Sequence, residues 1–157
     1  MQLIFEVETE KAMICLGELV GRQLRPGYLL FLFGELGAGK TTFTKGIALG
    51  MGVEEPITSP TFQLIKSYQG RFLLNHLDLY RLNNPEELKV LDPEELVEEG
   101  VTVVEWGKLL LERLNPEYLE VEIEPQPGGF SREVRLRSRG KLYDRVLERI
   151  DHADLRN

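Results

Sequence analysis

A glycine-rich segment that ends in lysine and threonine is the part of this sequence best suited to chemistry. The Walker A spacing, G-x-x-x-x-G-K-[ST], is matched in full by Gly34-Glu35-Leu36-Gly37-Ala38-Gly39-Lys40-Thr41. Glycines let the backbone curl until its N–H groups point at phosphate oxygens, and the positive end of a following helix adds to the attraction. Lys40 would reach the β- and γ-phosphates, Thr41 would place its hydroxyl on Mg²⁺, and Thr42 could donate to the α-phosphate. The segment therefore predicts a nucleoside triphosphate site.

Two acids are candidates for the metal and for the attacking water. A phosphate loop needs a second acid at the end of a buried strand, to hold the metal directly or through water. Glu105 ends the run Val101 to Val104, and Asp78 lies near the end of Phe72 to Leu77. We rank Glu105 first as the metal ligand because the strand before it is uniformly apolar and β-branched. Asp78 is then the candidate that orients or deprotonates the water, and a surface carboxylate is the alternative for each acid.

Two further motifs have a structural and a functional interpretation each. Ser59-Pro60-Thr61-Phe62 lies where nucleotide-sensing loops often occur, so Thr61 could contact Mg²⁺ or the γ-phosphate, or it could cap a proline turn. His76 lies beside Asp78. A lone histidine is more often structural than catalytic, and we favour the structural role for His76.

The segments on either side of the glycine-rich stretch fit the same interpretation. Tyr28 to Phe33 is a continuous apolar run, which is typical of a strand buried on both faces of a parallel sheet, and it leads directly into Gly34. Thr41 to Met51 is expected to be a helix that ends near Gly50. A glycine-rich turn without a ligand is the alternative, and this flanking strand and helix weaken it.

Periodicity and turn residues predict the remaining elements. Alternation predicts a strand over residues 3–7, and a helix over residues 10–24 follows Thr9, a possible cap. Two hairpins are expected, one joining residues 62–68 to 72–79 and one joining 118–123 to 134–137. Short helices begin at prolines 85 and 93, and a last helix covers residues 141–150. Together these elements predict an α/β protein, a P-loop NTPase three-layer sandwich with a mixed, mainly parallel central sheet.

Composition limits the remaining possibilities. With 157 residues, 42% of them hydrophobic, the chain has the size and composition of one compact domain, so we expect a single P-loop ATPase domain over residues 1–157. Its longest apolar run is far shorter than the roughly 20 residues of a spanning helix, and its first residues lack the positive region of a signal peptide, so we expect a cytoplasmic protein without a membrane anchor. The net charge of −7 argues against direct nucleic-acid binding. The lone cysteine, Cys15, is expected to be a buried thiol because its neighbours are apolar.

Taken in order, the motifs resemble those of the bacterial TsaE (YjeE) family. The resemblance spans about residues 5 to 140 and rests on the glycine-rich segment followed by Ser59-Pro60-Thr61-Phe62, His76-Leu77-Asp78-Leu79-Tyr80-Arg81 and Val104-Glu105-Trp106. Members of that family are the small ATPases of tRNA threonylcarbamoyladenosine (t⁶A37) biosynthesis, which act with the TsaD–TsaB heterodimer. The resemblance implies hydrolysis of ATP to ADP and phosphate with Mg²⁺, and contact with tRNA only through that protein complex.

The resemblance also implies roles for individual residues. Thr41 and Glu105 would hold Mg²⁺, and Asp78 would be needed for hydrolysis together with Lys40. The residues implied in ATP binding are Thr9, Gly37, Ala38, Gly39, Lys40, Thr41, Thr42, Lys108 and Arg132. Trp106 could pack on the base or fill core, and we favour core.

Three other functions compete with a partner-coupled ATPase. A small-molecule kinase would use the basic run Arg132 to Arg139 to grip the phosphate of its acceptor. A GTPase switch is less favoured because no Asn-Lys-x-Asp sequence, the guanine-reading motif, occurs in the chain. A nucleotide-binding scaffold without useful turnover is the third, and acceleration of hydrolysis by partners would distinguish it from an ATPase.

Overall fold

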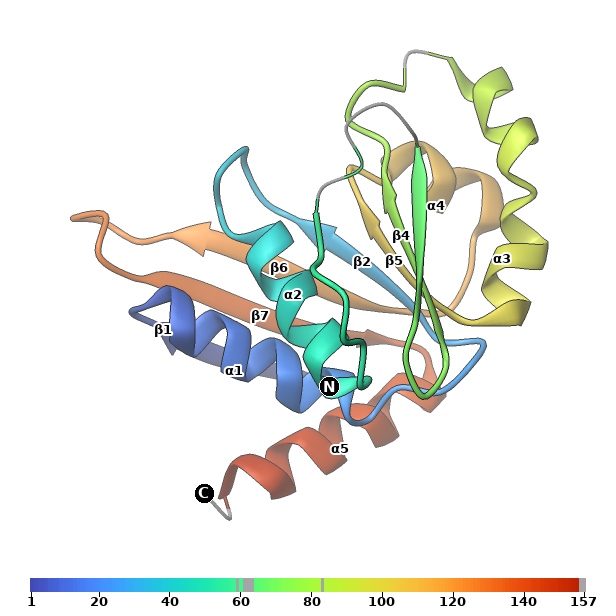
Figure 1. Cartoon of the computed structure of the whole chain (residues 1–157). Coiled ribbons are helices and arrows are strands. Elements are labelled where there is room, and N and C mark those ends of the chain that lie inside the picture. Colours follow the sequence, from blue (N-terminus) through green and yellow to red (C-terminus); the bar gives the residue numbers. More distant parts are fainter. Residues whose placement is uncertain (59, 61–63, 83, 156–157) are drawn as a thin grey trace.

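Seven strands form one mixed sheet in the computed structural model, which describes residues 1–58, 60, 64–82 and 84–155 (Figure 1). The strands are β1 (Gln2–Val7), β2 (Leu29–Phe33), β3 (Ile65–Gln69), β4 (Leu73–Asp78), β5 (Val101–Glu105), β6 (Tyr118–Pro125) and β7 (Arg132–Arg139). Their order across the sheet is β1-β7-β6-β2-β5-β4-β3. The four central strands β6, β2, β5 and β4 run parallel, whereas β1 and β7, β7 and β6, and β4 and β3 pair antiparallel.

Helices cover both faces of the sheet. One apolar core joins the sheet to α1 (Glu10–Gly21), α2 (Lys40–Gly50) and α5 (Lys141–Leu155). A second core on the opposite face joins it to the 3₁₀ helix η1 (Pro85–Leu91), α3 (Pro93–Glu99) and α4 (Lys108–Leu114). Strand β2 contributes to both, because its alternate residues Leu30 and Leu32 face the first core and Leu29 and Phe31 face the second. This arrangement confirms the three-layer α/β fold with a sheet that is parallel in its centre.

The predicted elements are present with small shifts at their ends. Both hairpins form, the prolines at 85 and 93 begin helical segments, and the strand before Glu105 ends at that residue. The first helix ends at Gly21 rather than near Leu24, and the last one continues to Leu155. Helix α4 was not predicted, because a short apolar run such as Leu109 to Leu111 does not by itself distinguish a helix from a strand.

The prediction of a buried Cys15 was wrong: its side chain is exposed. Helix α1 buries Met13, Leu16, Gly17, Val20 and Gly21, which is a stripe with the i, i+3, i+4, i+7, i+8 spacing of one helix face. Cys15 is two residues from Met13 and therefore about 200° around the helix from it. Apolar sequence neighbours do not bury a helical residue when they lie on a different face.

Helices α1 and α2 approach each other closely through glycine. A Cβ atom added to Gly17 would lie 2.4 Å from the carbonyl oxygen of Phe43, and one added to Gly46 would lie 2.3 Å from that of Ile14. Each helix carries two such glycines at i, i+4 spacing, since Gly21 and Gly50 show the same crowding. The contact therefore fixes α2, and with it the glycine-rich segment at its start, against α1.

None of the helices in the described residues is long and apolar enough to cross a bilayer.

Candidate functional site

The glycine-rich segment forms a loop between β2 and α2. Gly37 and Gly39 have φ angles of 80° and 119°, in the left-handed region that favours glycine, and Gly39 caps α2. The N–H of Ala38 donates to Glu35 across a turn (3.0 Å), and the first helical bond runs from the N–H of Phe43 to Gly39 (2.9 Å). The loop thus brings tightly curled backbone to the positive end of a helix, which is the geometry that binds phosphate.

The ammonium of Lys40 lies against the loop rather than in solvent. Its Nζ donates to the carbonyl oxygens of Gly34 (2.5 Å) and Glu35 (3.0 Å) and lies 4.2 Å from the centre of the Trp106 ring. The residue is only 5% exposed. Burial lowers the pKa of the Lys40 ammonium, and the nearby Glu105 and Asp78 carboxylates act in the opposite direction.

The two candidate acids lie side by side at the ends of adjacent parallel strands. Asp78 ends β4, Glu105 ends β5, and the two residues are opposite each other in the register. Both line a cavity of about 230 Å³ together with Lys40, Thr41 and Trp106. Burial raises the pKa of the Asp78 carboxyl, and the charge of Glu105 raises it further, while the N–H of Tyr80, which donates to its Oδ1 (3.0 Å), lowers it. The structure therefore brings together the lysine, the hydroxyl and both acids that the sequence singled out.

Sequence reasoning missed how Glu105 is held. The imidazole of His76 is fully buried, and its Nε2 lies 2.5 Å from Oε2 of Glu105, itself 3% exposed. His76 is two residues before Asp78 on β4, so its side chain lies on the same face of the sheet as Asp78. The structural role we favoured for His76 agrees with this contact, in which the imidazole orients the carboxylate. The alternation His76-x-Asp78 was the only sequence signal of this geometry, and it did not identify Glu105 as the partner.

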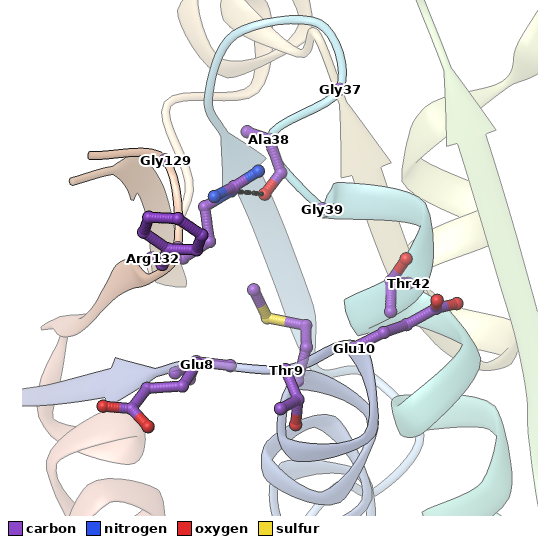
Figure 2. Close-up of a pocket in the computed structure, with 12 residues that line it drawn as sticks. Glu8, Thr9, Glu10, Gly37, Ala38, Gly39, Thr42, Gly129 and Arg132 are labelled. Atoms are coloured by element: carbon purple, nitrogen blue, oxygen red, sulfur yellow. Dashed lines mark hydrogen bonds between the residues drawn. The ribbon is translucent and has the colours of Figure 1, made fainter. Parts of the chain in front are cut away.

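A second cavity, of about 350 Å³, lies on the other side of the loop, and its lining includes Thr9 and Arg132, two residues outside the loop that the resemblance implies in ATP binding. Figure 2 shows Arg132 reaching the loop at Ala38 and Thr9 at the start of α1, across the cavity from the loop. The Nε of Arg132 donates to the carbonyl oxygen of Ala38 (3.2 Å). Thr9 caps α1, because its Oγ1 accepts from the N–H of Ala12 (3.0 Å), so the cap predicted from the sequence is confirmed.

The two cavities share part of their lining. Gly37, Gly39 and Thr42 belong to both, so the cavities meet at the loop and the first turn of α2. A ligand that lies across these three residues would extend into a polar compartment with two carboxylates on one side and toward Thr9 and Arg132 on the other. This shape fits an elongated molecule whose phosphate chain lies along the loop and ends beside the carboxylates.

The predictions for three further residues, Lys108, Thr61 and Trp106, are not simply confirmed. Lys108 is exposed at the start of α4 and lines neither cavity, so its contact with nucleotide stays a prediction. Thr61 lies outside the described residues, as do most of its neighbours in that loop. Trp106, which we expected in the core, is half-buried: it packs against the second apolar core and also lines the cavity that contains Glu105. Its ring centre lies 4.9 Å from that of Tyr80.

The residues present fit Mg²⁺ in the manner of a nucleotide site. Within the described residues, no group of three or more His, Cys, Asp or Glu side chains could form an all-protein metal site. Mg²⁺ at nucleotide sites is held by one or two protein groups together with phosphate oxygens and water. Thr41 and Glu105, which line one cavity, are such a pair.

The strand, the glycine-rich loop and the helix, with acids at the ends of neighbouring parallel strands, define an α/β protein with the P-loop NTPase fold. A family model described as threonylcarbamoyl adenosine biosynthesis protein TsaE matches residues 7–134. The chain belongs to the TsaE family, which confirms the resemblance seen in the sequence.

Individual relatives agree with the family. The chain is similar to the tRNA threonylcarbamoyladenosine biosynthesis protein TsaE of Bacillus subtilis, with 39% identity over 140 residues that cover 88% of this chain and 87% of the relative. The protein of the same name from Treponema pallidum is 48% identical over 103 residues, which cover 65% and 76% of the two chains. The crystal structure of Bacillus subtilis YdiB superposes with a TM-score of 0.81 at 34% identity, covering 98% of this chain and 97% of that one.

Proposed function

We propose that this chain is an Mg²⁺-dependent ATPase that hydrolyses ATP to ADP and phosphate and acts, with a TsaD–TsaB-type complex, in the formation of t⁶A37 in tRNA. The observation that supports it most is the convergence of Lys40, Thr41, Asp78 and Glu105 on one cavity beside the glycine-rich loop. A lysine and a hydroxyl at the start of α2, opposed by two carboxylates, are the groups that phosphoryl transfer needs.

Each side chain has a distinct task in this proposal. The backbone of the loop and the ammonium of Lys40 bind the phosphates, and Lys40 would exchange its two carbonyl acceptors for phosphate oxygens. Thr41 and Glu105 would hold Mg²⁺, which when bound neutralises charge on the phosphate chain. Asp78 would orient the attacking water and accept its proton, a task favoured by a carboxyl pKa above its ordinary value.

The pathway rests on the family. The relatives from Bacillus subtilis and Treponema pallidum carry the name tRNA threonylcarbamoyladenosine biosynthesis protein TsaE, and the Bacillus subtilis relative covers most of this chain. A net charge of −7 makes independent tRNA binding unfavourable, so a role through a protein complex that holds the tRNA is physically reasonable.

Replacing Lys40 tests the phosphate site. Lys40→Ala removes charge-assisted hydrogen bonds worth about 1.5–3 kcal/mol, so ATP affinity should fall by about 10- to 100-fold, while the circular dichroism spectrum stays unchanged. The matched control is Lys45→Ala, which removes an exposed lysine from the same helix. Calorimetric titration with MgATP measures both, and unchanged affinity in Lys40→Ala would refute the site.

Replacing the acids separates their tasks. Glu105→Gln keeps the shape and removes a charge facing the metal, so turnover should fall by at least about tenfold and should need more Mg²⁺. Asp78→Asn should lower turnover at an unchanged Mg²⁺ requirement. If Asp78→Asn shifts the Mg²⁺ requirement and Glu105→Gln does not, the two assignments are exchanged.

Titration with the partner tests the coupling. The described residues show no arginine in the cavity that contains Asp78 and Glu105, so hydrolysis by the chain alone should be slow, well under about one turnover per second. A TsaD–TsaB pair should associate preferentially in the presence of ATP and should change the rate of phosphate release. Equal association with ATP, with ADP and without nucleotide, with no change in phosphate release, would contradict the coupling.

The kinase alternative is less well supported by the arrangement of β7. Arg137 donates to Glu120 (2.7 Å) and Glu122 (3.0 Å) on β6, and Arg139 donates to Glu120 (3.2 Å). These ion pairs compensate the charge that was expected to grip the phosphate of an acceptor. Transfer of labelled γ-phosphate to a metabolite rather than to water would nevertheless favour the kinase.

A further inference from the structure

An aromatic side chain stands exposed at the edge of the cavity that contains Thr9 and Arg132. Phe130 lies between β6 and β7, lines that cavity and is 86% exposed. Burying a phenylalanine side chain contributes about 1.5–3 kcal/mol, which a ligand that covers this ring would gain. Because the ring lies beside a cavity, it is available to contact a bound ligand.

The turn that carries Phe130 has defined geometry. Gly128 and Gly129 have φ angles of 93° and 74°, which only glycine adopts easily. The N–H of Gln126 donates to Ser131 (3.0 Å), and the N–H of Gly129 donates to Gln126 (3.1 Å). These hydrogen bonds fix the backbone of the turn. Phe130 lies in it two residues before Arg132, whose guanidinium donates to the carbonyl oxygen of Ala38 in the loop.

The rest of the cavity lining is mixed, because the carboxylates of Glu8 and Glu10 lie among apolar side chains. The glycine-rich loop and Thr42 form the side that faces the phosphates in the proposed function. Val7 and Met13 add apolar surface. Met13 reaches the loop, since a Cβ atom added to Gly39 would lie 3.2 Å from its Cε. A flat aromatic group attached to a phosphate chain would meet an aromatic ring and aliphatic side chains here.

We propose that Phe130 stacks on the nucleobase of the bound nucleotide and acts as an affinity-determining residue of the site. The inference rests on the proposed function, because it requires the triphosphate to occupy the glycine-rich loop. Aromatic stacking on a base tolerates different bases, since every base has a π-face. Phe130 therefore contributes affinity for base-carrying ligands as a class and none for a bare phosphate chain.

Comparing a ligand with a base to one without it tests the assignment. Calorimetric titration of the full chain with MgATP and with magnesium tripolyphosphate gives both affinities. Phe130→Ala should weaken ATP binding by about 5- to 150-fold, the range that stacking on one base supplies, and should leave tripolyphosphate binding within about twofold of the wild type. Phe130→Tyr keeps the ring and should restore ATP binding.

Val90→Ala is the matched control, because Val90 is an equally exposed apolar residue (88%) on η1 and lines neither cavity. Two results would overturn the assignment: ATP affinity unchanged in Phe130→Ala, or ATP and tripolyphosphate weakened equally, which would indicate a disturbed loop. A wild-type chain that binds neither ligand would refute the ATPase proposal itself, so failure of the two proposals is distinguishable.

Discussion

Gly46→Ala tests whether the close contact between α1 and α2 supports the site. A Cβ at Gly46 would lie 2.3 Å from the carbonyl oxygen of Ile14 and 2.8 Å from the Cα of Gly17. Both are backbone atoms, so no side chain can rotate away, and the helices must separate by about 1 Å to reach ordinary contact. Overpacking costs about 1–3 kcal/mol, and a rigid clash lies at the upper end of that range. The alanine returns about 1 kcal/mol of helix propensity.

The net expectation for Gly46→Ala is a loss of about 2 kcal/mol in the free energy of unfolding, or about 4–8 °C in melting temperature for a chain of this length. Urea denaturation measures the loss, with Lys45→Ala as the control for a substitution on the exposed face of α2. ATP affinity should fall too, because α2 carries the loop and α1 carries Thr9. A variant as stable as the wild type, or more stable by the propensity gain, would refute the reasoning.

Two further substitutions test buried polar contacts. Burial raises the pKa of Tyr143 to about 12, so wild-type stability should be complete below about pH 10 and fall by about 2–3 kcal/mol as pH rises from 10 to 12, where only the unfolded state ionises. Tyr143→Phe should remove this pH dependence, and it should lower the free energy of unfolding by about 1–3 kcal/mol at neutral pH because the N–H of Leu29 loses its acceptor. Urea titrations of the two proteins that give parallel pH profiles would contradict this account of Tyr143. His76→Gln places an amide nitrogen near the position of Nε2 and should retain the bond to Glu105. His76→Asn should lose that bond and need more Mg²⁺ for half-maximal ATPase activity, and equal Mg²⁺ requirements would exclude a positioning role for His76.

The parts of the fold that sequence predicts best are those whose signal is local. Tyr28 to Phe33 is a continuous apolar run typical of a strand buried on both faces, and the glycine spacing that follows specifies the loop and the helix with its lysine. Helix α4 escaped prediction because its type is decided by the packing of Leu110 in the second core rather than by its own seven residues. Short elements depend on their surroundings more than on propensity.

The site was predicted as a set of residues and not as a geometry. The acids Asp78 and Glu105 were identified one at a time, but their adjacency depends on the register between β4 and β5, which are separated in sequence by η1 and α3. The contact between His76 and Glu105 depends on the same register. Phe130 was overlooked for a different reason, because an aromatic residue in a glycine-rich turn gives no periodic signal, and only the exposure of its ring beside a cavity identifies it.

The basic run on β7 shows how pairing between strands changes the meaning of a charge pattern. In the sequence, Arg135, Arg137 and Arg139 form a basic cluster, but in the sheet the glutamates of β6 face them, and Glu122 alone contacts both Arg135 (3.7 Å) and Arg137 (3.0 Å). Binding to a phosphate backbone gains its affinity from cations that are free to displace counterions, and cations already paired with carboxylates supply little of it. The proposed function therefore includes another chain that holds the tRNA, which is why the partner titration bears on it as directly as the loss of Lys40 does.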